Sequence, residues 1–307
     1  EMILWMAAGL VRIGAYPIHT WVPRDHPPSS PATAALLLSP LLGWGLWIRL
    51  ASVGGGSLPV RPWMMVPAVL TLLGGGILAW TENEVGKSRR WISMAGNGTI
   101  LLAVVLSHLR GEGSASVAPG SAFSGVMMIG VLGWVLATTV LFLGGGVDLR
   151  RGLGRFRWLW AVPSLIGALS LVGAPLTAGF AGAAAALGGA VRTRDWVLVV
   201  VGFVGHLLLS AATARWLLGC EPADVEDSGM VGRFTYGTGL GVVAVAVIVC
   251  GAVPGMLLPG DAAHRDLTIR TLLAAPSLGG WLLWGGGVLM GGALAWVDRG
   301  FRPRVSL

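Results

Sequence analysis

Apolar runs of about 20 residues follow one another along almost the whole chain, and an α-helix needs this length to cross the hydrocarbon core of a bilayer. Charged residues make up 11% of the chain, against roughly 25% in soluble domains. Lipid offers no hydrogen bonds to an exposed backbone, so runs of this kind must form helices. The sequence therefore predicts an all-α polytopic membrane protein embedded in a lipid bilayer.

Nine of these runs can be separated, each bounded by charged residues or by Gly and Pro clusters. They cover residues 1–16, 31–50, 63–80, 91–109, 123–147, 158–190, 196–218, 238–258 and 281–297. We expect about nine transmembrane helices in a single membrane domain over residues 1–307. The chain opens with Glu1 inside an apolar run and without a signal peptide, so we expect further helices to precede it in the full-length protein.

Two of the runs are interrupted by residues that break helices. Pro17 follows Arg12 by five residues and cannot donate a helical hydrogen bond. The run 158–190 is too long for one crossing and contains Gly173, Pro175 and Gly179. Paired broken helices in two halves of a transporter point to an inverted repeat with ion sites at the breaks. The alternative is that these residues only kink continuous helices.

Arg12 follows an apolar stretch from Met2 to Val11, which places a permanent cation well inside the hydrocarbon. A guanidinium at that depth is costly unless it faces protein or water. One interpretation is a fixed charge beside an ion pathway. The other is a side chain that snorkels to the interface from a helix end.

Two histidines are candidates for moving protons, because imidazole titrates near neutral pH. His19 follows the first break, where it could be a proton entry point or could bond a carbonyl freed by Pro17. His206 lies inside the seventh run, as a proton relay or as a side chain bonded to a neighbouring helix.

The loop charges predict an orientation, because Lys and Arg gather on the cytoplasmic side. One side would carry twelve, namely Arg24, Lys87, Arg89, Arg90, Arg150, Arg151, Arg155, Arg157, Arg233, Arg299, Arg302 and Arg304, and the other seven, namely Arg49, Arg61, Arg110, Arg192, Arg194, Arg265 and Arg270. We expect the first side, with the carboxyl terminus, to be cytoplasmic. The net charge of +7 therefore indicates membrane loops and no nucleic-acid partner. Cys220 and Cys250 lack ligand spacing, so we expect no metal site.

The order Arg12, Pro17, His19, Trp21 and Pro23, followed by Asp25 and a Pro-rich segment, resembles a known family signature. It is that of the antiporter-like membrane subunits of respiratory complex I (NADH:quinone oxidoreductase), related hydrogenases and Mrp-type cation/proton antiporters. Residues 80–93 are similar to the family's acidic-then-basic loop, and residues 169–180 to its second helix break.

The resemblance implies an inverted-repeat antiporter-like fold. Its first repeat would end within 1–50, the second would cover 63–218 with its break near 173–179, and carboxyl-terminal helices would cover 238–297. The implied function is translocation of protons or monovalent cations, beside other membrane subunits of a complex in a prokaryotic cytoplasmic membrane. The implied role is that of a non-redox subunit of an NADH-quinone oxidoreductase-type translocase. No cofactor is implied on this chain, because partner subunits would handle NADH and quinone.

The sequence also departs from the family's row of exchangeable Lys, His and Glu residues. Arg12 stands where the family has a lysine, although an arginine does not release its proton. Thr138 stands near a basic position of the fifth run, and Ala or Gly fills 181–183, where a Lys or Glu is expected. The candidate pathway is therefore Arg12, His19, Thr138 and His206. A degenerate structural subunit that no longer pumps and a stand-alone secondary transporter remain alternatives.

Two groups of residues are expected near the membrane surface. Asp25, Glu82, Glu84 and Lys87 lie between apolar runs, as a cytoplasmic docking face for a neighbouring subunit or as solvated loops. The tryptophans near the ends of runs are typical of interfacial anchors rather than of a cofactor site; they include Trp44, Trp47, Trp63, Trp158, Trp160 and Trp281.

Overall fold

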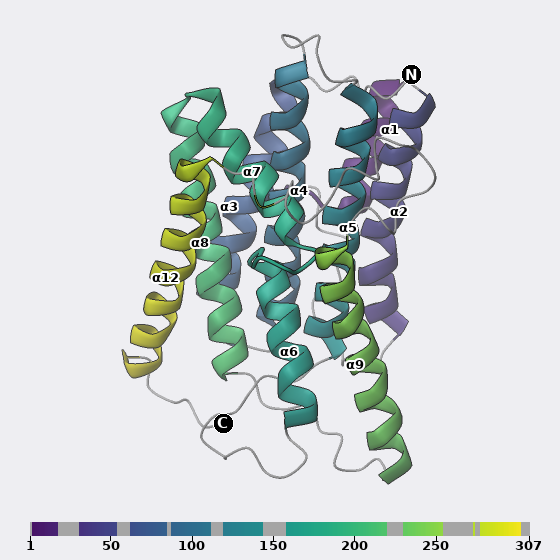
Figure 1. Cartoon of the computed structure of the whole chain (residues 1–307), viewed down its shortest axis with the longest axis vertical. Coiled ribbons are helices and arrows are strands. Elements are labelled where there is room, and N and C mark those ends of the chain that lie inside the picture. Colours follow the sequence, from purple (N-terminus) through teal and green to yellow (C-terminus); the bar gives the residue numbers. More distant parts are fainter. Residues whose placement is uncertain are drawn as a thin grey trace.

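The structure is a computed structural model, and it describes residues 2–17, 31–53, 62–84, 87–111, 119–143, 158–219, 230–253, 273 and 277–301. Within these ranges every regular element is helical, which confirms the all-α prediction (Figure 1). The elements are α1 (Met2–Ile13), α2 (Pro31–Val53), the short 3-10 helix η2 (Pro62–Met64), α3 (Met65–Thr81), α4 (Ser88–Gly111), α5 (Pro119–Leu143), α6 (Trp158–Leu171), α7 (Phe180–Thr193), α8 (Trp196–Gly219), α9 (Met230–Ala252) and α12 (Leu278–Phe301).

Three helical segments in the described ranges are long and apolar enough to cross a membrane: Pro62–Thr81, Trp196–Leu218 and Leu278–Asp298. Four more apolar helical segments are shorter, at 10–17 residues: Met2–Ile13, Met128–Phe142, Ala161–Leu171 and Gly237–Ala252. The apolar runs of the sequence therefore coincide with helices.

The helix boundaries differ from the apolar runs where backbone chemistry decides them. The run 158–190 is divided into α6 and α7, with residues 172–179 between the two helices. α9 ends at Ala252 rather than at residue 258, because Pro254 disfavours helical backbone in the residue before it. α9 also begins at Met230, eight residues before the apolar run, because a helix can continue past the apolar part of its sequence.

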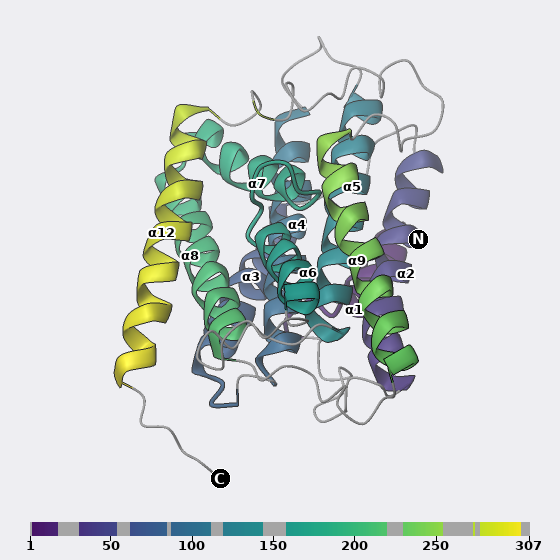
Figure 2. The same cartoon turned by 60° about the horizontal axis from the view of Figure 1, so that its bottom comes forward.

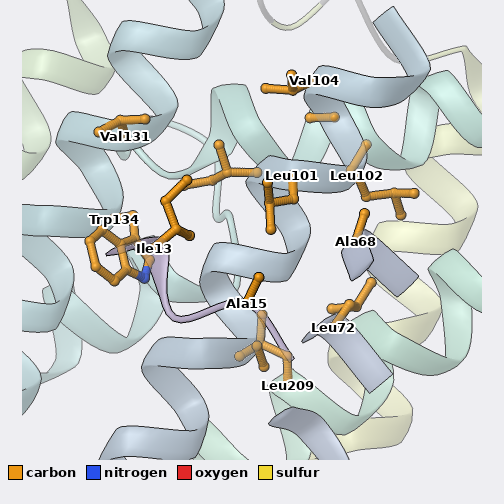
Figure 3. Packing of buried hydrophobic residues seen from close by; sticks show 14 of the residues in the cluster. Ile13, Ala15, Ala68, Leu72, Leu101, Leu102, Val104, Val131, Trp134 and Leu209 are labelled. Atoms are coloured by element: carbon orange, nitrogen blue, oxygen red, sulfur yellow. The ribbon is translucent and has the colours of Figure 1, made fainter. Parts of the chain in front are cut away.

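α4 occupies the centre of the bundle, where it packs against α3, α5, α7 and α8 (Figure 1). α1 and α2 pack against each other on one flank, α12 packs against α8 on the other, and α9 covers α5 and α6. In Figure 2 α8 and α12 again lie side by side, at the edge opposite α2. The largest buried apolar cluster surrounds α4; Figure 3 shows part of it, including Ile13, Ala15, Leu72, Leu101, Leu102, Trp134 and Leu209.

Trp44 and Trp47 are fully buried, so their interpretation as interfacial anchors is wrong. Their rings meet edge to face, with centroids 5.6 Å apart. The Trp47 Nε1 donates a hydrogen bond to the Met6 carbonyl at 3.1 Å, beside Gly9. Gly9 on α1 leaves room for the Trp47 indole, and composition alone does not reveal this contact.

Candidate functional site: two helix ends inside the bundle

α1 ends inside the bundle through a glycine. Gly14 has a φ of 76°, a left-handed conformation that glycine adopts without steric cost. Its N–H donates to the Val11 carbonyl at 3.1 Å, and the Ala15 N–H donates to the Leu10 carbonyl at 3.1 Å. This pair of bonds is the Schellman motif, which closes helix carboxyl termini. The sequence predicts the break at Pro17, but the helix has already ended four residues earlier.

Neighbouring helices bond the backbone groups that this ending leaves free. Asn97 Nδ2 on α4 donates to the Ile13 carbonyl at 3.1 Å, and Ser39 Oγ on α2 donates to the Arg12 carbonyl at 3.2 Å. The Tyr16 N–H donates to Thr71 Oγ1 on α3 at 3.0 Å. Asn97 lies about 14 Å along α4 from its first residue, so this helix end is deep in the bundle.

α6 ends with the same arrangement. Gly173 has a φ of 64° and donates to the Ser170 carbonyl at 3.0 Å. The Ala174 N–H donates to the Leu169 carbonyl at 2.8 Å, which completes a second Schellman motif. Both endings read Gly-Ala and then reach a proline, Pro17 in one case and Pro175 in the other. The two helix ends are therefore built in the same way.

The second helix end is also bonded from its surroundings. Trp284 Nε1 on α12 donates to the Val172 carbonyl at 2.9 Å, and the Ala178 N–H donates to the Val247 carbonyl of α9 at 3.0 Å. The Gly179 N–H donates to Ser170 Oγ at 3.1 Å. A β-carbon added at Gly179 would lie 1.8 Å from the Ser170 carbonyl oxygen, so the loop passes α6 where only glycine fits.

α4 and α5 connect the two helix ends through close glycine contacts. Gly96 precedes Asn97, and a β-carbon there would lie 2.9 Å from Cδ1 of Trp134. Gly133 precedes Trp134, and a β-carbon there would lie 2.4 Å from the carbonyl carbon of Ala178. The Trp134 Nε1 also donates to the Ser93 carbonyl of α4 at 2.9 Å. α4 and α5 therefore provide a continuous series of close contacts between the two helix ends.

The predicted pathway residues occupy different parts of the bundle. The Arg12 carbonyl belongs to the first helix end, but the Arg12 side chain is exposed on the outer face of α1. Thr138 is buried on α5 and donates to the Trp134 carbonyl at 2.7 Å. His206 is buried on α8 and faces α12, where a β-carbon at Gly287 would lie 2.6 Å from its Cδ2. His19 lies outside the described residues.

The loop between α3 and α4 contains most of the predicted docking residues. Glu84 and Lys87 form an exposed ion pair, with 2.9 Å between Oε2 and Nζ. Glu82 instead contacts the start of α4. Its Oε2 lies 3.5 Å from Nη2 of Arg90 and accepts a hydrogen bond from Trp91 Nε1 at 3.4 Å. Asp25, the fourth predicted residue, lies outside the described residues.

Comparison with known families places this arrangement in context. A family model described as "NADH:quinone oxidoreductase/Mrp antiporter, TM" matches residues 1–209, which is more than half of the chain. The chain belongs to this family. It is an integral membrane protein, and the relatives that it resembles are bacterial.

Two curated relatives show the extent of the similarity to this antiporter family. NADH-quinone oxidoreductase subunit N of Thermobifida fusca (strain YX) is 28% identical over 261 residues, which are 81% of this chain and 47% of the relative. Subunit N 2 of Sorangium cellulosum (strain So ce56) is 32% identical over 233 residues, 69% of this chain and 45% of the relative. The chain thus spans about half the length of the curated relatives it matches.

Two solved structures share the fold. The Mrp complex from Dietzia sp. DQ12-45-1b aligns with a TM-score of 0.67 at 16% identity, over 98% of this chain and 35% of that chain. Respiratory complex I from Thermus thermophilus with bound aureothin aligns with a TM-score of 0.60 at 20% identity, over 85% of this chain and 58% of that chain. Both matched chains belong to multi-subunit complexes.

The residues that hold the helix ends of this family member were mostly missed by sequence reasoning. Asn97 and Ser39 bond backbone groups at the first helix end. Thr71, Ser170 and Trp284 were not singled out. Thr71 and Ser170 are polar residues in the middle of apolar runs, which is a usable signal, whereas Trp284 resembles any other tryptophan near a run end.

Proposed function

We propose that this chain is an antiporter-like membrane subunit that contributes to proton or cation translocation in an NADH:quinone oxidoreductase-type or Mrp-type complex. The observation that carries the proposal is the pair of matching helix ends deep in the bundle. Each has a glycine-closed terminus and backbone groups bonded by side chains of neighbouring helices. Irregular backbone is tolerated at membrane depth where protein surrounds it or where it lines an ion path.

The matching ends also support a repeat organisation. We infer that α1 and α6 occupy equivalent places in two inverted repeats, within 1–50 and 63–218, followed by carboxyl-terminal helices over 238–297. The interruptions near Pro17 and 173–179 would then make two of about nine transmembrane helices discontinuous. The loop charges support a cytoplasmic location, in a prokaryotic cell, for the α3–α4 loop and the carboxyl terminus.

Arg12 has a defined place in this proposal. Its backbone lies at the depth of Ser39, about 12 Å along α2 from that helix's first residue, while its side chain is exposed. A permanent cation at membrane depth must face protein or water. We infer that Arg12 faces a polar neighbour in the assembled complex and acts as a fixed charge that biases protonation nearby.

A second candidate is a structural subunit that no longer pumps. One observation favours it: at both helix ends the polar side chains already bond backbone groups. In addition, Ala181 and Ala183 are buried where the family resemblance implies a Lys or Glu. Such a subunit would keep the fold and the contacts with other membrane subunits, and would leave the redox steps with NADH and quinone to its partners.

Proton flux in vesicles that contain the full-length complex separates the two candidates. We expect Arg12→Ala to lower the flux by about tenfold, because without this cation a neighbouring group would release its proton less readily. A unit charge about 10 Å away contributes about 1.7 kcal/mol at an effective dielectric constant of about 20. Arg12→Lys keeps the charge and should retain the flux. Arg49→Ala removes another exposed cation, on α2, and should leave the flux at its wild-type rate. An unchanged flux in Arg12→Ala would remove the pathway role of Arg12, and an intact wild-type complex without flux would favour the structural subunit.

A further inference from the structure

α8 carries a row of buried polar side chains whose polar atoms have no hydrogen-bond partner among the described residues. These atoms are both ring nitrogens of His206, Oγ of Ser210, Oγ1 of Thr213 and Nε1 of Trp216. Each of the four residues is 3% exposed or less. Their spacing of four, three and three residues places them above one another on the helix, over a length of about 15 Å.

The hydroxyls of this row behave differently from other hydroxyls in the bundle. Thr99 and Thr138 each donate to the carbonyl four residues earlier in their own helix, at 3.3 Å and 2.7 Å. That bond is the usual way for a membrane helix to satisfy a threonine. Ser210 and Thr213 do not make it, so their hydroxyls are available to another molecule. Buried polar groups of this kind are commonly satisfied by internal water.

The inner end of the row lies beside the second helix end. The His206 ring sits against Gly287 of α12, and the Trp284 carbonyl faces the ring without meeting hydrogen-bond geometry. The Trp284 indole itself donates to the Val172 carbonyl, in the segment between α6 and α7. Farther along α12, a β-carbon at Gly291 would lie 2.8 Å from Cβ of Ser210. α12 therefore covers the row closely along its inner half.

Arg215 is next to Trp216 in the sequence, on the face of α8 opposite His206, and it marks the level of the bundle surface at the outer end of the row. Arg215 donates to the Glu82 carbonyl at 2.7 Å, and its Nε lies 3.6 Å from Oδ2 of Asp298 on α12. The side chains of this ion pair are 10% and 16% exposed, so the site borders on solvent. The outer end of the row thus lies at the level of the α3–α4 loop.

We propose that the α8 row binds a file of internal water molecules and that protons move along it between the second helix end and the level of the α3–α4 loop. Proton movement along this file rests on the proposed function, whereas water binding does not. Water and hydroxyl groups both donate and accept, so each oxygen takes up one proton as it releases another. His206 accepts a proton at one ring nitrogen and releases one from the other, which leaves its charge unchanged and exchanges its tautomer, so the ring must turn over before it passes the next proton.

The double variant Ser210→Ala/Thr213→Val tests the file in the full-length protein within its complex. It removes both hydroxyls at nearly constant volume. We expect proton flux in vesicles to fall by about tenfold, because one lost hydrogen bond to water along the path raises the barrier. We expect the melting temperature in detergent to stay level or to fall. If the row were dry, removing two unsatisfied hydroxyls, at about 1–3 kcal/mol each, would instead raise the melting temperature, by about 4 °C or more.

Two further variants keep the test decisive. Thr213→Ser retains a hydroxyl and should keep the flux. If the double variant fails to assemble, Thr213→Val alone replaces it, and Thr213→Ser is again the variant that keeps the hydroxyl. Thr99→Val is the matched control, because its hydroxyl bonds only its own helix. A wild-type flux together with a raised melting temperature in the double variant would overturn the proposal. If the wild-type complex moves no protons, the proposed function fails, and the melting temperatures alone decide whether the row binds water.

Discussion

Asn97→Ala is expected to destabilise the protein by about 2–6 kcal/mol, because it leaves two buried groups without partners at about 1–3 kcal/mol each. Asn97 Oδ1 accepts from the Trp44 indole at 3.1 Å, while Nδ2 donates to the Ile13 carbonyl at 3.1 Å. Asn97 is 2% exposed and Trp44 is fully buried, so water does not replace either bond at little cost. One side chain thus joins α4, α2 and the end of α1. Thermal unfolding of the full-length protein in detergent measures the effect.

Two comparison variants separate this bridge from a general effect of mutating α4. Thr99→Ala, two residues away, loses only a hydrogen bond within its own helix at 3.3 Å and should cost about 1 kcal/mol or less. Asn97→Asp keeps an acceptor for Trp44 but, when ionised, has no donor for the Ile13 carbonyl, so it should be nearly as damaging as Asn97→Ala. Equal stability of Asn97→Ala and Thr99→Ala would show that the bridge does not hold the helix end.

The sequence predicts the helices well because lipid imposes a single rule on every apolar run. Eight of the nine runs each correspond to one described helix, and the run 158–190 becomes α6 and α7 around the glycines and proline that indicated a break. The boundaries are less predictable, because they depend on local backbone geometry. Pro17 is visible in the sequence, but Gly14 ends α1, and among the 49 glycines of the chain the sequence does not single out Gly14 as one with a positive φ.

The site is less predictable than the fold, because it depends on which face of a helix each side chain occupies. Trp44 reads as an interfacial anchor, yet it lies in the core and bonds Asn97. Arg12 reads as a buried charge, yet only its carbonyl lies in the bundle. Thr71 is a single polar residue within the apolar stretch Met65–Trp80 of α3, and only tertiary packing decides that it is buried.

Gly179→Ala is expected to destabilise the protein by about 2–4 kcal/mol, combining overpacking with a lost hydrogen bond. The added β-carbon would lie 1.8 Å from the Ser170 carbonyl oxygen and 2.7 Å from its carbonyl carbon. Both atoms are backbone, so no side-chain rotation relieves the clash. The Gly179 N–H must then move away from Ser170 Oγ, which it now meets at 3.1 Å. The loop between α6 and α7 would be displaced as a result.

Gly292→Ala on α12 is the matched control, because a β-carbon there meets no heavy atom within 4 Å. This variant should be neutral or should stabilise its helix by about 0.5–1 kcal/mol, the usual gain for Gly to Ala in a helix interior. The two substitutions are chemically identical and should therefore act in opposite directions in the same unfolding measurement. Proton flux should follow the melting temperature in Gly179→Ala, because the displaced loop carries the Val172 carbonyl that Trp284 bonds. A Gly179→Ala protein that matches Gly292→Ala in stability and flux would mean that the second helix end does not need this close approach.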